Sequence, residues 1–150
     1  MYSTLKLNLI PAFTPMIMIV TPLAATAISI LYVRLALDVI TIRKREKIGL
    51  GSAGNEPLER ACRAHANLTE WAPIGLILIA ALELNNTPIW LSALPAIAFV
   101  AGRALHPKGM TSTEPGAFKQ RTLGMQLTIY GIIALASLNV LWMVYRLFTS

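Results

Sequence analysis

The chain has 150 residues, of which 55% are hydrophobic and 13% are charged. A soluble domain of this size needs roughly a quarter of charged residues to cover its surface, so this composition excludes an ordinary soluble protein and indicates a chain that sits in lipid. The net charge of +6 would suit nucleic acid if the basic residues formed one patch. They gather instead in short segments between apolar runs, which is typical of membrane topology and excludes nucleic acid as a partner.

Four apolar segments are long enough to cross a bilayer as helices, which takes about 20 residues at a rise of ~1.5 Å each. Their apolar runs are continuous rather than alternating, which favours helices over a β-barrel. The first is too long for the core of a signal peptide and is read as a retained span. The sequence predicts an all-α membrane protein, a four-transmembrane-helix bundle forming one domain over residues 1–150, with helices at about 16–42, 60–84, 88–105 and 123–147.

Basic residues mark one side of this bundle. The loop after the first span and the loop before the fourth are basic, whereas the opposite side carries the short turn at 85–87 and two basic residues. Because cytoplasmic loops carry an excess of Lys and Arg, we expect both basic loops in the cytoplasm and both termini on the other side. The residues used are Arg43 to Lys47, Lys108, Lys119 and Arg121 on the first side, and Lys6 and Arg146 on the second.

A polar stripe opens the second span. At ~100° per residue, Arg60, Arg63, Asn67 and Glu70 fall within an arc of roughly 80°, with Trp71 beside them. Ionisable groups at membrane depth are costly unless they are paired or wet, so the stripe must face a neighbouring helix or a water-filled cleft. Two readings remain open: a binding site, or a stripe that neutralises itself through pairs of Arg63 with Glu70 or of Arg60 with Glu59.

Other ionisable side chains fall at membrane depth. In the first span, Arg34 and Asp38 are four residues apart and predict a local structural pair. Cys62 offers no thiol cluster for a metal and is interpreted as a small buried apolar residue. His65 is interpreted as a packing or subunit-contact residue. No metal site is expected.

The arginines near the cytoplasmic third converge on one region. Arg103 ends the third span and Arg121 opens the fourth, on the same side as the polar stripe and Arg43. The long stem of Arg103 could extend to the membrane interface or reach into the same cleft as Arg63. Planar guanidiniums hold carboxylates or phosphate bidentately, which leaves Asn67 and Glu70 for an ammonium or amide. The pattern predicts a small, polyanionic and zwitterionic ligand.

Small residues recur in the last two spans and allow close approach of helices. This gives independent support for oligomerisation without fixing a subunit number. The residues are Ser92, Ala96 and Ala104 in the third span, and Gly124, Thr128 and Gly131 in the fourth.

The run from Glu59 to Pro73, with its Glu-Arg pair and its spaced Arg, Asn, Glu and Pro, resembles the signature of the MAPEG family, the membrane-associated proteins in eicosanoid and glutathione metabolism. The resemblance extends over nearly the whole chain and is strongest to the small bacterial members. It implies a homotrimer in the bacterial inner membrane, with glutathione bound between subunits near the cytoplasmic face as co-substrate. Its implied glutathione contacts are Arg60, Arg63, Asn67, Glu70, Trp71, Arg103 and Arg121, of which Arg103 and Arg121 would come from the adjoining subunit. Arg43 is implied as the stabiliser of the thiolate.

The implied activity is that of a membrane-bound glutathione transferase or peroxidase. A thiol with an unperturbed pKa of about 8.5 is mostly protonated at neutral pH, and a nearby guanidinium favours the nucleophilic thiolate. The thiolate would then attack a lipophilic electrophile from the bilayer or reduce a lipid hydroperoxide. Trp71 stands where the family often has tyrosine, and Leu105, His106 and Pro107 replace the tyrosines that usually follow the third-span arginine.

Two alternatives belong to other classes of function. The same bundle could be a non-catalytic protein that binds lipid or docks a partner, since the family contains such a member. A proton or ion pathway through the Arg and Glu cluster would need a continuous polar path, and the apolar second half of the second span argues against it.

Overall fold

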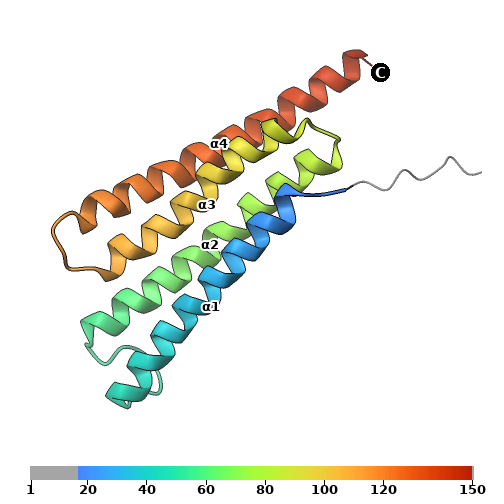
Figure 1. Ribbon diagram of the computed structural model, residues 1–150. Coiled ribbons are helices and arrows are strands. Elements are labelled where there is room, and N and C mark those ends of the chain that lie inside the picture. Colours follow the sequence, from blue (N-terminus) through green and yellow to red (C-terminus); the bar gives the residue numbers. More distant parts are fainter. Residues whose placement is uncertain (1–16, 150) are drawn as a thin grey trace, which may run out of the picture.

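The computed structural model describes residues 17–149, and these form four α-helices with no strand (Figure 1). The helices are α1 (Val20–Glu46), α2 (Glu56–Leu84), α3 (Ile89–Thr111) and α4 (Ala117–Thr149). All four are long and apolar enough to cross a membrane. The predicted all-α four-helix membrane bundle is therefore confirmed. Lys6 and the predicted first residue of the first span, Met16, lie outside the described residues.

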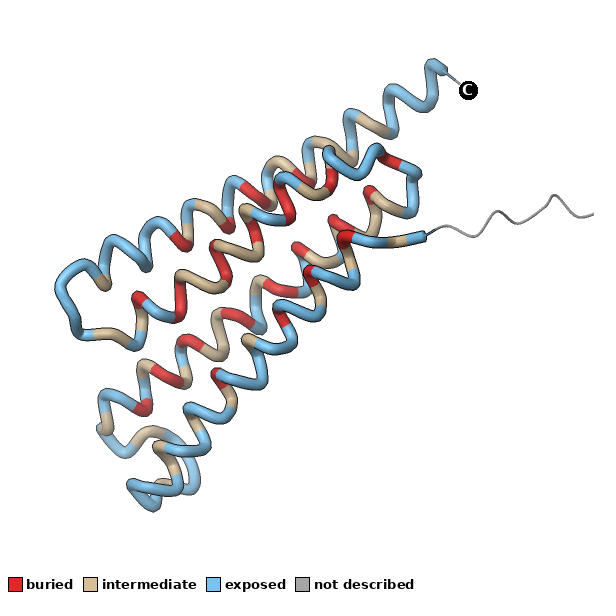
Figure 2. Tube along the Cα trace, in the orientation of Figure 1, coloured by how far each residue is buried: buried red, intermediate tan, exposed pale blue. Residues whose placement is uncertain are grey.

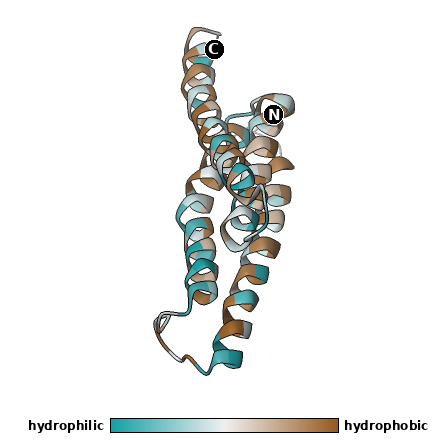
Figure 3. Cartoon of the chain, turned by 90° about the vertical axis from the view of Figure 1, so that its left-hand side faces the viewer, coloured by the Kyte–Doolittle hydropathy of each residue, from teal (hydrophilic) through white to brown (hydrophobic). Residues whose placement is uncertain are grey.

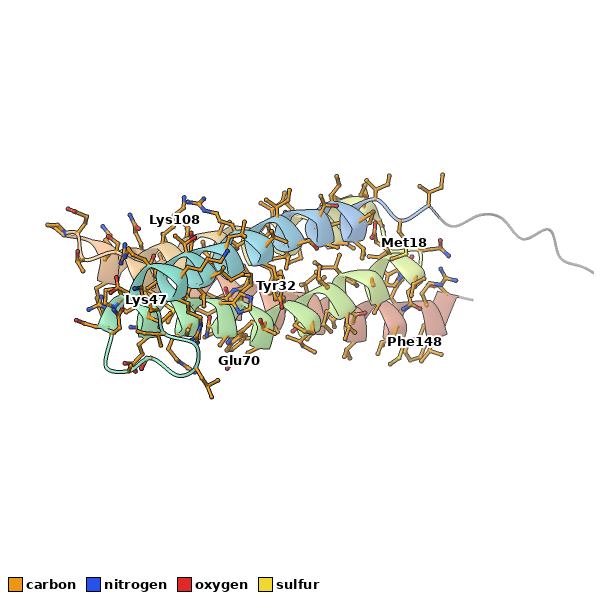
Figure 4. The ribbon with its side chains drawn as sticks, turned by 90° about the horizontal axis from the view of Figure 1, so that it is seen from below. Met18, Tyr32, Lys47, Glu70, Lys108 and Phe148 are labelled. Atoms are coloured by element: carbon orange, nitrogen blue, oxygen red, sulfur yellow. The ribbon has the colours of Figure 1, made fainter. Side chains whose placement is uncertain are left out.

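The helices run up and down, and α2 contacts each of the other three. The most extensive contact joins α3 and α4, whereas α1 and α4 do not touch within residues 17–149. The α1–α2 and α3–α4 loops lie at one end of the bundle, which Figure 4 marks with Lys47 and Lys108. Met18 and Phe148 lie at the other end. Hydrophilic residues gather toward the two-loop end (Figure 3). The polar stripe lies in the first half of α2, which begins at this end.

The outer surface of the bundle is apolar. Buried residues follow the inner faces of the helices, and exposed ones cover the outside and the free end of α4 (Figure 2). Ile30, Leu94 and Ile97 are each at least 65% exposed. In lipid such side chains carry no penalty, but they also supply no hydrophobic drive for helix association, so packing depends on close fit.

Glycines provide this close fit between α3 and α4. A Cβ atom on Gly124 would lie 2.6 Å from the backbone nitrogen of His106, and one on Gly102 would lie 2.6 Å from Thr128 Oγ1. Gly124, Thr128 and Gly131 are buried against α3 of the same chain. The small residues of the fourth span therefore serve packing within one chain and do not stand free as a subunit interface.

The helix ends differ from those predicted from apolar length. α2 begins at Glu56 rather than Arg60, because Asn55 Oδ1 accepts a hydrogen bond from Leu58 N at 2.9 Å and Pro57 suits the first turn. α3 passes through Pro107 to Thr111, and α4 begins at Ala117 rather than Leu123. α1 likewise continues from Ile42 to Glu46. Apolar length finds the part of a helix in hydrocarbon, whereas these helices continue into the polar end.

Glu83 is a charged residue within the second span whose partner lies on another helix. α1 starts without a capping side chain of its own, since Ile19 offers none. Glu83 of α2 accepts hydrogen bonds from the backbone N–H groups of Ile19, Val20 and Thr21, at 2.8, 2.8 and 2.7 Å. A carboxylate at a helix N-terminus satisfies free amides and complements the helix dipole. Glu83 thus ties α2 to the start of α1.

Candidate functional site

A groove of about 880 Å³ opens at the two-loop end of the bundle, between α2, α4 and the end of α3. From α2 it is lined by Arg60, Arg63 and Asn67, which the sequence predicted as site residues. Arg121 of α4 joins them. Its other lining residues are Glu56, Glu59, His106, Met110, Phe118, Thr122, Met125, Gln126 and Ile129.

Local structure brings the three α2 residues to the groove. Arg60, Arg63 and Asn67 lie three and four positions apart, so they project from one face of a helix. The Asn55 cap starts α2 early enough for Arg60 to lie in a regular helix rather than a loop. These three residues of the predicted polar stripe therefore form one wall of the groove.

The stripe does not neutralise itself in either predicted way. Arg60 pairs with Glu56 rather than with Glu59, with 2.5 Å between Nη2 and Oε1. No carboxylate oxygen among residues 17–149 lies within 4.0 Å of a nitrogen of Arg63 or of Arg121. Both side chains are exposed. The groove therefore presents two cations with no acidic partner in the described chain.

The predicted pair of Arg34 and Asp38 is also absent. No nitrogen of Arg34 approaches the carboxylate of Asp38 within 4.0 Å in the described structure. Both residues are exposed on α1. The spacing of four residues permits such a pair without requiring it, since long side chains lose rotamer freedom on pairing.

Arg103 lies beneath the groove and is 1% exposed. Its Nη1 donates to Asn67 Oδ1 at 2.9 Å and its Nε donates to Thr128 Oγ1 at 2.9 Å. The guanidinium carbon lies 5.8 Å from the centre of the Trp71 ring, in a cation–π contact. Its partners are thus neutral, and no carboxylate in the described chain lies within 4.0 Å of it.

Glu70 and Trp71 do not line the groove, although both lie on α2 beside it. Glu70 is exposed and appears at the outer edge of the helix in Figure 4. Trp71 is half-buried and packs against Arg103. Within one chain the structure brings together four of the predicted site residues in the groove, with Arg103 directly below.

Arg43 lies elsewhere, near the loop that follows α1. Its Nη1 donates to the carbonyl oxygens of Gly51 at 3.0 Å and Ile48 at 3.4 Å, and its Nη2 lies 3.7 Å from Cys62 Sγ. It does not line the groove of its own chain. In this chain Arg43 therefore stabilises the α1–α2 loop.

Several groove residues were not predicted as site residues. His106 is buried, and its Nδ1 lies 3.0 Å from the carbonyl oxygen of Arg121, which holds the end of α3 to the start of α4. Met110 lies on the part of α3 beyond the predicted end of the third span, so apolar length did not place it on a helix. Gln126 lies within the predicted fourth span, but nothing in its spacing connects it with the polar stripe of α2. Among residues 17–149 no cluster of three His, Cys, Asp or Glu is arranged to hold a metal.

A four-helix membrane protein with a cationic groove at its charged end is the class that this fold and site define. The sequence model of the MAPEG family matches residues 21–141, and the chain belongs to that family. It is similar to the inner membrane protein YecN of Escherichia coli, in strains K12 and O6:H1 (CFT073). Each comparison gives 28% identity over 131 residues, covering 87% of this chain and 98% of YecN.

Proposed function

We propose that the groove binds glutathione and that the protein is a glutathione transferase or peroxidase acting on lipophilic substrates. The observation that carries the proposal is the pair of unneutralised guanidiniums, Arg63 and Arg121, facing one groove above the buried Arg103. Glutathione carries two carboxylates, and guanidinium forks hold carboxylates with directional, charge-assisted hydrogen bonds. Family membership supports the same ligand.

The chemistry follows from a cation beside the sulfur. A guanidinium favours the thiolate over the thiol, and the released proton passes to solvent. In conjugation the thiolate forms a carbon–sulfur bond, and the electron pair displaced from the electrophile leaves with its leaving group or takes up a proton. In the peroxidase reaction two glutathiones are oxidised to the disulfide, while the hydroperoxide is reduced to an alcohol and water.

Within one chain, Arg63 and Arg121 would hold the carboxylates of glutathione, since both are unpaired and face the groove, so stabilising the thiolate falls to another cation. The resemblance assigns this role to Arg43, which in one chain binds the loop carbonyls. In the proposed homotrimer, Arg43 would act in the groove of a neighbouring subunit. Glu70 and Trp71 do not line the groove of their own chain, and they would likewise contact glutathione in the groove of a neighbouring subunit.

The proposed setting is the inner membrane, as the name of YecN states for that relative. A groove at the cytoplasmic end would meet a water-soluble thiol from one side and a lipophilic electrophile from the other. Met110, Met125, Phe118 and Ile129 give the groove apolar walls beside its arginines. Such mixed walls suit a polar thiol reacting with an apolar partner.

The test is turnover by the purified protein in detergent. With glutathione and a chloronitroarene or a lipid hydroperoxide, we expect thioether or alcohol product above the rate without protein. Arg121→Gln should lower the rate by at least tenfold, because it removes an unpaired groove cation while the backbone contact to His106 remains. Arg45→Gln, on the exposed end of α1, is the matched control and should keep the wild-type rate. Equal rates in both variants would contradict the proposal.

A second candidate, a non-catalytic lipid-binding protein, is favoured by another groove. This groove of about 490 Å³ lies between α1 and α3 and is lined by apolar residues, among them Leu23, Ala27, Ala93 and Ala101. Mass spectrometry of gently extracted protein would distinguish the candidates. A stoichiometric acyl lipid without turnover would favour lipid binding.

A further inference from the structure

Arg103 and Asn67 form a contact whose polarity restricts what the groove can recognise. Arg103 Nη1 donates to Asn67 Oδ1 at 2.9 Å and approaches the backbone oxygen of the same residue at 3.5 Å. An arginine has five N–H donors and no acceptor, whereas an asparagine side chain has one oxygen and one NH₂ group. The amide can meet the guanidinium only through its oxygen, which leaves the NH₂ group as its free edge.

The guanidinium itself has little freedom to turn. Its Nε donates to Thr128 Oγ1, whose own proton goes to the carbonyl oxygen of Gly124 at 2.8 Å. Nη2 lies 3.9 Å from Met125 Sδ, and the Trp71 ring lies 5.8 Å from the guanidinium carbon. With a side chain 1% exposed and held on each side, Arg103 keeps one orientation and so fixes the amide of Asn67.

Asn67 connects this buried cation to the groove, because Asn67 lines the groove and Arg103 does not. A cation that donates to the amide oxygen polarises the amide, which makes the remaining N–H groups stronger donors. Part of the positive charge of Arg103 is thereby presented at the groove wall. The charge also has no carboxylate within 4.0 Å in the described chain.

We propose that Arg103 is a positioning residue that turns the Asn67 amide N–H toward the groove, so that the site selects a ligand acceptor, a carboxylate or a peptide carbonyl, at that point. An ammonium group, which the sequence pattern left open for Asn67, is rejected there. The inference rests on the proposed function for the identity of the ligand, glutathione. The contact between Arg103 and the amide oxygen stands without it.

Asn67→Asp and Asn67→Ala test this polarity. Aspartate keeps the size of asparagine and pairs with Arg103, but it turns an acceptor toward the groove instead of a donor. Equilibrium dialysis with labelled glutathione should show affinity falling at least tenfold in Asn67→Ala and further in Asn67→Asp. The melting temperature should follow another order, with Asn67→Asp at or above wild type and Asn67→Ala below it. A general loss of stability would lower the affinity and the melting temperature in the same order, so it cannot produce these two different orders.

Arg103→Gln tests whether Arg103 acts through Asn67. We expect the single variant to bind glutathione several-fold more weakly. In the Asn67→Ala background, adding Arg103→Gln should cause no further loss, because residues that act through one contact are not additive. Additive losses would overturn the positioning role, and Asn67→Asp binding as tightly as wild type would overturn the donor polarity.

The two proposals fail separately. If the wild type binds no glutathione, the proposed function is overturned. The positioning claim is then decided by the melting temperatures: Asn67→Asp at or above wild type supports it, and Asn67→Asp as low as Asn67→Ala overturns it.

Discussion

Individual arginines of this chain differ in what neutralises them, and this difference decides which of them can bind a ligand. Arg60 carries Glu56 at 2.5 Å, while Arg63 and Arg121 meet no carboxylate within 4.0 Å in the described residues. A cation that already holds a carboxylate must give it up or share it before it binds another anion. Arg63 and Arg121 are free of that cost.

We therefore expect Arg63→Gln and Arg60→Gln to have unequal effects on glutathione affinity. A charge-assisted hydrogen bond contributes about 1.5–3 kcal/mol, so loss of Arg63 should weaken binding by roughly 10- to 100-fold. Loss of Arg60 should weaken it less than about threefold, within the small contribution of an exposed pair. Titration calorimetry on the two variants is the measurement, and equal losses would count against the assignment.

The sequence predicted where these residues lie on the helix better than it predicted which side chains they contact. Periodicity alone aligned Arg60, Arg63 and Asn67, because three- and four-residue spacing fixes a helix face. It could not predict that Glu56 rather than Glu59 pairs with Arg60, since the pair depends on a helical spacing of four residues and the predicted helix began only at Arg60. Nor could it predict that Arg103 is buried, because that depends on how closely α3 approaches α4.

At the scale of elements, α1 depends on a carboxylate from α2. Its first amides are satisfied by Glu83 rather than by a residue of their own segment. Such a cap is invisible to local sequence analysis, since it joins residues more than 60 positions apart. The lengths of the apolar segments, which predicted four spans, do not predict this contact between Glu83 and the start of α1.

Glu83→Gln should lower the stability of the bundle by about 1–2 kcal/mol, through loss of a capping acceptor and of its charge at the helix N-terminus. Thermal unfolding in detergent, followed by circular dichroism, measures it. Glu114→Gln is the matched control, because Glu114 is exposed in the α3–α4 loop. A Glu83→Gln melting temperature equal to that control would contradict the capping role.

The α3–α4 contact gives a second prediction for an element pair. Gly124→Ala places a methyl group where the His106 backbone already lies, so the helices must separate, at a cost of about 1–3 kcal/mol. Gly49→Ala serves as control, since nothing lies within 4 Å of its added methyl. A melting temperature that falls in both variants alike, or in neither, would show that close approach is unimportant.

At the scale of the whole molecule, the α1–α2 and α3–α4 loops lie at one end and the described chain termini at the other. The basic residues that the sequence placed in these loops lie mostly on the helix ends beside them, at the end of α1, in the last turn of α3 and at the start of α4. The bundle predicted from sequence is correct in class and in the number of spans. Sidedness and subunit number depend on the membrane and on other chains, so the fold of a single chain does not fix them. Positive charge in and beside the loops favours a cytoplasmic location for that end of the bundle.

Reporter fusions would determine sidedness. Alkaline phosphatase, which is active only outside the cytoplasm, should be active when fused after Ser150 and inactive when inserted at Gly51 in the α1–α2 loop. The reverse pattern would contradict the proposed orientation and would place the cationic groove away from the cytosolic thiol.

The central claim is that the groove between α2 and α4 is a glutathione site built from unpaired arginines. Isothermal titration of the detergent-solubilised protein with glutathione tests it most directly, using the Arg63→Ala/Arg121→Ala double variant and Arg45→Ala as control. We predict saturable binding by the wild type and by Arg45→Ala, and none by the double variant at millimolar glutathione. No binding by the folded wild type, or equal binding by the double variant, would contradict the account.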